Sequence, residues 1–126
     1  VTTIAAVAME IAARSGLPDE VRPGFASLAT DALAKALAMT EPAGGITGPA
    51  ARGDDSTFLF ELAHLDRMAP QAVPIVVALA RESLRQRSRC AAPDPPQAAL
   101  AELLSRADLL DLTKDRVLTS KPKPPG

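Results

Sequence analysis

The chain has 126 residues and a formal net charge of −1, which suits one domain with a moderate core. The balanced charge and the low aromatic content of 2 % argue against nucleic acid or an anionic membrane as a partner. A single Cys and a single His argue against a disulfide or a zinc site within one chain and favour a cytoplasmic location, and no apolar run predicts a membrane span.

The N-terminal third predicts two helices. Residues 1–15 carry apolar side chains at helical spacing, and Gly16 suits the end of this helix. A second helix is expected over 25–39, after a break at Pro23, and it is apolar enough to be covered on more than one side. The first helix opens on apolar residues without a capping residue, so we expect a fragment, or a chain that a second chain completes.

The remaining sequence predicts further helices and no strand. The expected helices cover residues 56–68, 70–89, 97–105 and a short stretch over 108–116. Their inward-facing positions are Phe58, Leu59, Leu62, Leu65, Val73, Val76, Val77, Ala80 and Leu84. The basic end of the fourth helix, with Arg81, Arg85, Arg87 and Arg89, is interpreted as a solvated face. We therefore expect an all-α bundle of about five helices over 1–116, followed by a disordered tail over 117–126.

Residues 44–57, the glycine segment, hold most of the chain's glycines and several polar side chains. Glycine lets a ligand approach the main chain, and free N–H groups at a helix start can hold a small anion. The candidate substrate-binding residues are Thr47, Gly48, Arg52, Asp54, Ser56 and Thr57. Arg52 would pair with a carboxylate, the three hydroxyl groups would donate hydrogen bonds, and Asp54 would cap the helix and orient Arg52. The structural alternative is a rigid helix connector in which Arg52 pairs with Asp54 or Asp55.

The sequence Ile46-Thr47-Gly48-Pro49-Ala50-Ala51-Arg52-Gly53-Asp54, followed by Thr57 and by His64-Leu65, resembles a known turn. It is similar to the C-terminal helical domain of oxidoreductase-like proteins related to pyrroline-5-carboxylate reductase and ketopantoate reductase. The resemblance extends from Val1 to Arg89. It implies an all-α fold like the C-terminal domain of 6-phosphogluconate dehydrogenase, a homodimer with intertwined helices, and a small anionic substrate near the turn. The glycine fingerprint of a Rossmann domain is absent, so the chain alone would hold no cofactor, and the parent enzyme would use NADP or NAD.

Two further functions remain open at this stage. The chain could be a free-standing helical interaction module without catalysis. His64 follows Glu61 by three residues and is expected beside Phe60, where a structural role competes with that of a phosphate acceptor in a phosphotransfer bundle. No catalytic residue is assigned.

Overall fold

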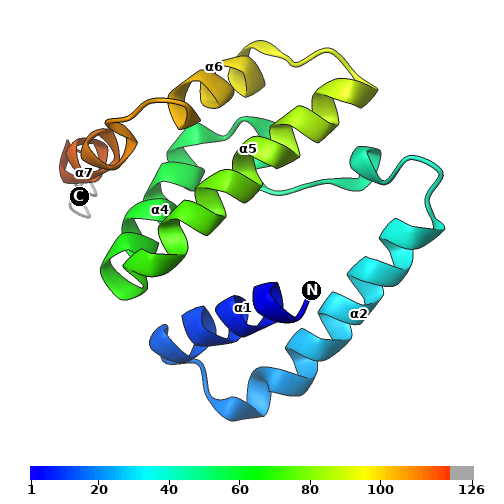
Figure 1. Cartoon of the computed structure of the whole chain (residues 1–126). Coiled ribbons are helices and arrows are strands. Elements are labelled where there is room, and N and C mark those ends of the chain that lie inside the picture. The colour runs from blue at the N-terminus through cyan, green and yellow to red at the C-terminus, as the bar shows by residue number, and fades with distance from the viewer. Residues whose placement is uncertain (120–126) are drawn as a thin grey trace, which may run out of the picture.

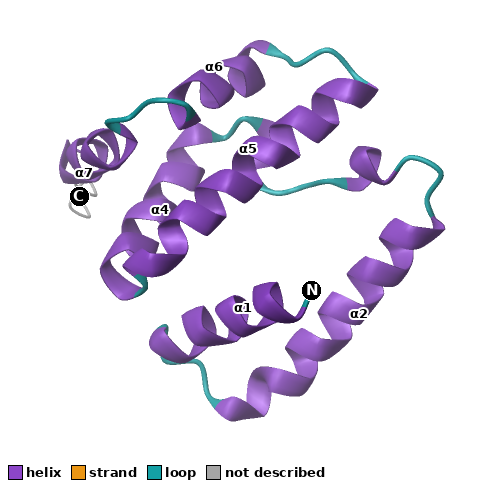
Figure 2. Cartoon of the chain, in the orientation of Figure 1, coloured by secondary structure: helices purple, strands orange, loops and turns teal. Residues whose placement is uncertain are grey.

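The computed structural model describes the main chain of residues 1–119 and the side chains of residues 1–115 (Figure 1). This part of the chain is all-helical and has no strand, as predicted (Figure 2). The α-helices are α1 (Thr2–Arg14), α2 (Arg22–Ala38), α3 (Pro49–Arg52), α4 (Asp55–Met68), α5 (Val73–Cys90), α6 (Pro95–Leu104) and α7 (Leu109–Thr119). Three 3₁₀ turns, η1 (Asp19–Val21), η2 (Pro42–Gly45) and η3 (Pro70–Ala72), lie between them.

The described residues form seven α-helices, where the sequence predicts a bundle of about five. One of the additional helices is α3, a single turn inside the glycine segment that is too short to leave a periodic pattern. Another is α7, which the sequence predicted only as a short continuation over 108–116 and which extends to Thr119. The rest of the tail that we expected to be disordered lies outside the described residues.

The hydrophobic core lies among α4, α5, α6 and α7. Helix α4 packs against α7 on one side and α5 on the other, while α6 lies along α5 (Figure 1). The inward positions predicted for α4 and α5 are confirmed as buried or partly buried. The buried core residues are Phe58, Leu59, Leu62, Val73, Ala80, Leu84, Leu100, Leu104 and Leu109. Short aliphatic side chains thus fill an interior that contains one aromatic ring.

Helices α1 and α2 form an arm that contributes little to this core (Figure 1). The arm is joined to the body by hydrogen bonds at α1, where Arg14 donates to the carbonyl oxygen of Met68 and Gln71 donates to Glu10. Helix α2 has no buried residue, and its Leu28 and Leu37 are 69 % and 77 % exposed. The expectation that this helix is covered on several sides is therefore wrong within one chain.

Proline positions explain where the observed helices depart from the expected bounds. Helix α2 begins at Arg22 rather than Phe25, because Pro23 lies in its first turn, where no donor is needed. Pro70 lies in the turn η3, and α5 follows from Val73. Helix α6 begins at Pro95, two residues before the prediction, because the preceding aspartate caps it.

Candidate functional site

The glycine segment changes direction twice around the single-turn helix α3. Gly48 precedes α3 with a φ of 109°, and Gly53 follows it with a φ of 72°. Side chains other than glycine rarely adopt these backbone angles. The two glycines therefore set the path by which the chain leaves η2, forms α3 and enters α4.

Gly53 lies directly against the start of α6. A Cβ atom at this position would lie 2.5 Å from the main-chain nitrogen of Gln97 and 2.5 Å from the carbonyl carbon of Pro96. Gln97 also donates from Nε2 to the carbonyl oxygen of Ala51, 2.8 Å away. The same glutamine forms a capping box with Asp94, so the group that holds the glycine segment is itself fixed.

Arg87 holds the other end of the glycine segment. Its Nη1 donates to the carbonyl oxygen of Ile46 at 2.7 Å, which joins α5 to the residue after η2. The Nε atom of Arg87 is buried and has no hydrogen-bond partner in the described part of the chain. The segment is thus held between α5 and α6 on its inner side.

Three of the candidate residues come together as the N-cap of α4. An Oδ1 oxygen of Asp54 accepts from the main-chain N–H of Thr57 at 3.2 Å and from the hydroxyl of Ser56 at 3.3 Å. Hydrogen bonds from Thr57 lower the pKa of Asp54 most, and Ser56 and the charge of Arg52 lower it further. Asp54 therefore caps the helix as predicted. Its carboxylate also accepts hydrogen bonds from Ser56 and Thr57, two residues whose donors we expected to face a ligand.

The main-chain donors of the turn are also largely used within the chain. The N–H groups of Arg52, Gly53, Asp54 and Asp55 donate to carbonyl oxygens of residues 48–53 at 2.9–3.1 Å. Within residues 1–115, the side chains of Thr47 and Arg52 are exposed and have no hydrogen-bond or ion-pair partner. The turn therefore offers a guanidinium group and a hydroxyl group to a ligand, rather than an array of bare amides.

A groove of about 370 Å³ separates the glycine segment from α2. Asp31, Lys35 and Met39 line it from α2 and the residue that follows it, and Gly45 and Ile46 line it from the other side. A Cβ atom at Gly45 would lie 2.9 Å from the sulfur of Met39, so the absence of a side chain there lets Met39 lie close. The groove places one cation and one anion beside the predicted turn.

His64 lies on α4 next to Phe60, as its spacing predicted. The two ring centroids are 5.3 Å apart, and the rings are tilted by 32°. His64 is exposed and borders a separate hollow of about 240 Å³ between α1 and α4. No group of three metal-ligating side chains occurs among the described residues, and none of the described helices has the length and apolarity of a membrane span.

Comparison with protein families gives one match. A family model described as a domain of unknown function, DUF2520, matches residues 1–83, which is more than half of the 126 residues. The chain belongs to the DUF2520 family. No curated protein and no solved structure matches the chain.

The DUF2520 match contains the glycine segment and the α2 groove, whereas both residues that hold the segment lie beyond it. Sequence reasoning missed Gln97 and wrongly placed Arg87 on a solvated face, because Arg87 is partly buried against Ile46. Each of the two residues nevertheless left a signal. Arg87 follows Ala80 by seven residues and Leu84 by three, which places it on the buried stripe of α5. The pair Asp94 and Gln97, three residues apart, has the spacing of a capping box. Lys35 and Asp31 left no such signal, because charged residues are ordinary on an exposed helix.

Proposed function

We propose that this DUF2520 chain is the dimerisation and substrate-binding domain of an NAD(P)-dependent, reductase-like protein that acts on a small carboxylate. The observation that carries the proposal is the exposed helix α2, which has 17 residues and no buried side chain. NADP or NAD would bind outside this chain, and no catalytic residue is assigned within it. The resemblance of the turn around Arg52 to that of reductase-like proteins supports the choice of reaction class.

The exposed arm supports a homodimer. Most of the stability of a helix in a protein comes from tertiary packing rather than from helix propensity, and within a single chain α2 has no buried residue. Covering an exposed leucine such as Leu28 or Leu37 contributes about 1.5–3 kcal/mol, and Ile4 and Phe25 belong to the same arm. A second copy carries the same apolar surface, and a two-fold axis would bring the two surfaces together.

The groove beside η2 supports a small anionic substrate. Lys35 lines the groove, and the guanidinium of Arg52 and the hydroxyl of Thr47 stand exposed in the adjoining turn. An arginine can bind a carboxylate through two parallel hydrogen bonds. Because α2 forms one wall, the contact that fixes α2 in a dimer would also fix the groove.

Light scattering coupled to size-exclusion chromatography tests the dimer. We expect the wild-type chain to elute as a dimer and the Leu28→Glu, Leu37→Glu double variant to elute as a monomer. The control Ala99→Glu adds a carboxylate to an exposed position on α6 and is expected to remain dimeric. A wild-type chain that stays monomeric at high concentration contradicts the proposal.

Amide chemical shifts test the substrate site. Pyruvate and L-proline serve as small carboxylate probes, and we expect them to shift resonances of residues 44–57. Arg52→Gln and Lys35→Gln should each weaken this binding, whereas Arg67→Gln, which removes an exposed guanidinium from α4, should not. If the amide resonances of the glycine segment do not shift when either carboxylate is added, the result contradicts the substrate assignment.

The second candidate is a helical interaction module without catalysis. The hydrogen bonds that occupy the amides of residues 52–55 and 57 favour it, because they make the turn rigid without any ligand. The module predicts the same loss of association in the Leu28→Glu, Leu37→Glu variant. It predicts no effect of carboxylates on the glycine segment, and this separates the two candidates.

A further inference from the structure

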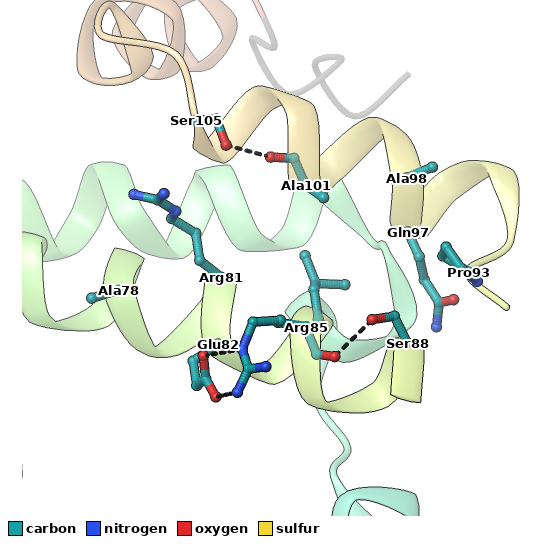
Figure 3. A pocket seen from close by; sticks show the side chains of 11 residues that line it. Ala78, Arg81, Glu82, Arg85, Ser88, Pro93, Gln97, Ala98, Ala101 and Ser105 are labelled. Atoms are coloured by element: carbon teal, nitrogen blue, oxygen red, sulfur yellow. Dashed lines mark hydrogen bonds and ion pairs between the residues drawn. The ribbon is translucent and has the colours of Figure 1, made fainter. Parts of the chain in front are cut away.

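A second groove, distinct from the glycine segment, runs between α5 and α6 (Figure 3). Its volume is about 550 Å³, and sites for small organic molecules have volumes of about 300–1,000 Å³. Leu84 and Ala78 line it from α5, and Ala98 and Ala101 line it from α6. The exposed wall is mostly apolar, although Ser88, Gln97 and Ser105 also line the groove. The short alanine side chains leave the space between the helices open.

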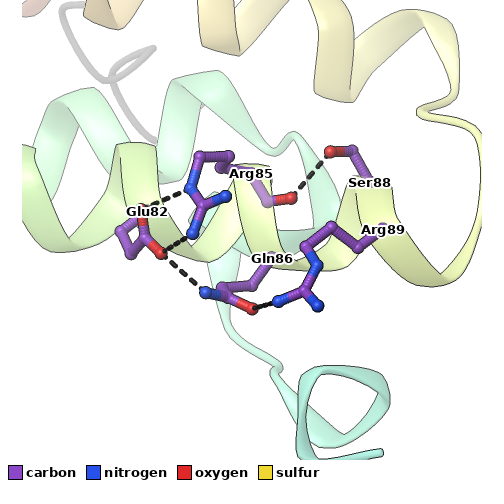
Figure 4. A network of polar contacts seen from close by, with 5 residues as sticks. All are labelled: Glu82, Arg85, Gln86, Ser88 and Arg89. Carbon is purple, nitrogen blue, oxygen red and sulfur yellow. Dashed lines mark hydrogen bonds and ion pairs between the residues drawn. The ribbon is translucent and has the colours of Figure 1, made fainter.

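The charges at this groove do not cancel. Arg85 donates from Nε and Nη2 to the two carboxylate oxygens of Glu82 at 2.8 and 2.6 Å, and Gln86 donates to the same carboxylate at 2.7 Å (Figure 4). These hydrogen bonds, that from Arg85 first, lower the pKa of Glu82 to about 2, so the pair stays ionised and internally neutral. Arg81 extends on the side of α5 that faces α6, and within residues 1–115 its guanidinium has no carboxylate partner (Figure 3).

The groove thus combines an aliphatic surface with one uncompensated cation. We propose that it binds a small amphipathic monocarboxylate, with the carboxylate on Arg81 and an unbranched apolar tail along Leu84, Ala98 and Ala101. A guanidinium suits a carboxylate because both are planar and can form two parallel hydrogen bonds. Among the lining residues the excess is one positive charge, which matches a monoanion, whereas a phosphate monoester brings a charge of about −2.

This site binds its ligand through residues other than those of the proposed substrate site, although Gln97, which holds Ala51 of the glycine segment, also lines this groove. Most of its lining residues, including Ala98 and Ala101, follow residue 83, where the family match ends. The two sites also suit different ligands. The apolar wall of the α5–α6 groove favours a ligand with an apolar tail, which pyruvate and L-proline lack. Binding to the two sites can therefore be measured, and can fail, separately.

The test is a titration of the full chain with octanoate, below its micelle concentration, followed by amide chemical shifts. We expect shifts that saturate and map to α5 and α6. Arg81→Gln should weaken octanoate binding about 2–5-fold, within the range for one exposed ion pair. Octanol, which has the tail without the charge, should bind wild type and Arg81→Gln equally.

Two variants complete the test. Ala98→Leu places a larger side chain at an exposed helical position, so the fold should tolerate it while the groove is filled and octanoate binding is lost. Arg67→Gln on α4 removes a guanidinium away from the groove and should bind octanoate as wild type does. Shifts confined to the apolar arm α1–α2, or octanoate affinity that neither Arg81→Gln nor Ala98→Leu changes, would overturn the proposal.

Discussion

The guanidinium of Arg87, on α5, donates through Nη1 to the carbonyl oxygen of Ile46, 2.7 Å away and 41 residues earlier in the chain. Ile46 also lines the groove beside α2, so this hydrogen bond fixes one wall of the candidate substrate site. The rest of the segment is held by Gln97 through the carbonyl oxygen of Ala51. Two side chains from the C-terminal part of the fold thus determine the position of a loop in the N-terminal part.

Replacing Arg87 by Met should lower the free energy of unfolding by about 1–3 kcal/mol, because the partly buried carbonyl group of Ile46 loses its donor. Urea unfolding followed by circular dichroism measures the change. Arg67→Met, an equivalent change at an exposed position on α4, should stay within about 0.5 kcal/mol of wild type. Equal stability of the two variants would show that the Arg87 hydrogen bond contributes nothing measurable.

Gly53→Ala should destabilise the fold by about 2 kcal/mol or more, because an added Cβ combines an unfavourable φ with a main-chain clash. Gly24 provides the matched control. It lies within α2 with open space around it, so Gly24→Ala should stabilise the protein by about 0.5–1 kcal/mol through helix propensity. Thermal unfolding of the two variants measures opposite shifts in Tm, and a loss of stability in both would contradict this account.

The all-helical fold and the core of α4 and α5 could be predicted from the sequence because they depend on local periodicity. Phe58, Leu59 and Leu62 recur at helical spacing, and proximity in sequence is enough to place them on one face. The contact of Gly53 with the start of α6 could not be predicted in this way. It depends on the packing of residues more than forty positions apart, which leaves no periodic pattern.

The contribution of the Asp54 cap to the stability of the fold should depend on pH. The folded pKa of Asp54 lies below its ordinary value, so ionised Asp54 stabilises the fold above about pH 4, and this contribution is lost as the pH falls through the lowered folded pKa. Asp54→Asn keeps an oxygen acceptor and removes the charge. The difference in Tm between wild type and Asp54→Asn should therefore be larger at pH 7 than at pH 2. A difference that does not change with pH would show that charge is irrelevant to this cap.

Leucine truncations should separate the core from the arm. Leu62→Ala should cost about 2–5 kcal/mol, because Leu62 is 1 % exposed and its removal leaves a cavity. Leu37→Ala should cost less than about 0.5 kcal/mol in dilute, monomeric protein, because Leu37 already faces water. Unfolding at several protein concentrations checks both values, and the effect of Leu37→Ala should grow with concentration if α2 is an interface.

At the candidate site, the sequence predicts the helix cap but not which donors bond to it. The Asp54 cap follows from a local pattern of side chains and is confirmed. The expected role of Asp54 in orienting Arg52 is not seen, because the carboxylate takes its hydrogen bonds from Ser56 and Thr57. Which of several nearby donors a carboxylate accepts from depends on the main-chain path through Gly48 and Gly53, and composition does not specify that path.

Helices α6 and α7 supply Leu100, Leu104 and Leu109 to the interior, and all three follow residue 83, where the family match ends. Cutting the chain at that boundary would expose Leu59 and Leu62 to solvent and remove the last turns of α5. The segment that matches the family is therefore shorter than the segment that builds the hydrophobic core. A chain that carried only residues 1–83 of this fold would need another apolar surface to cover Leu59 and Leu62.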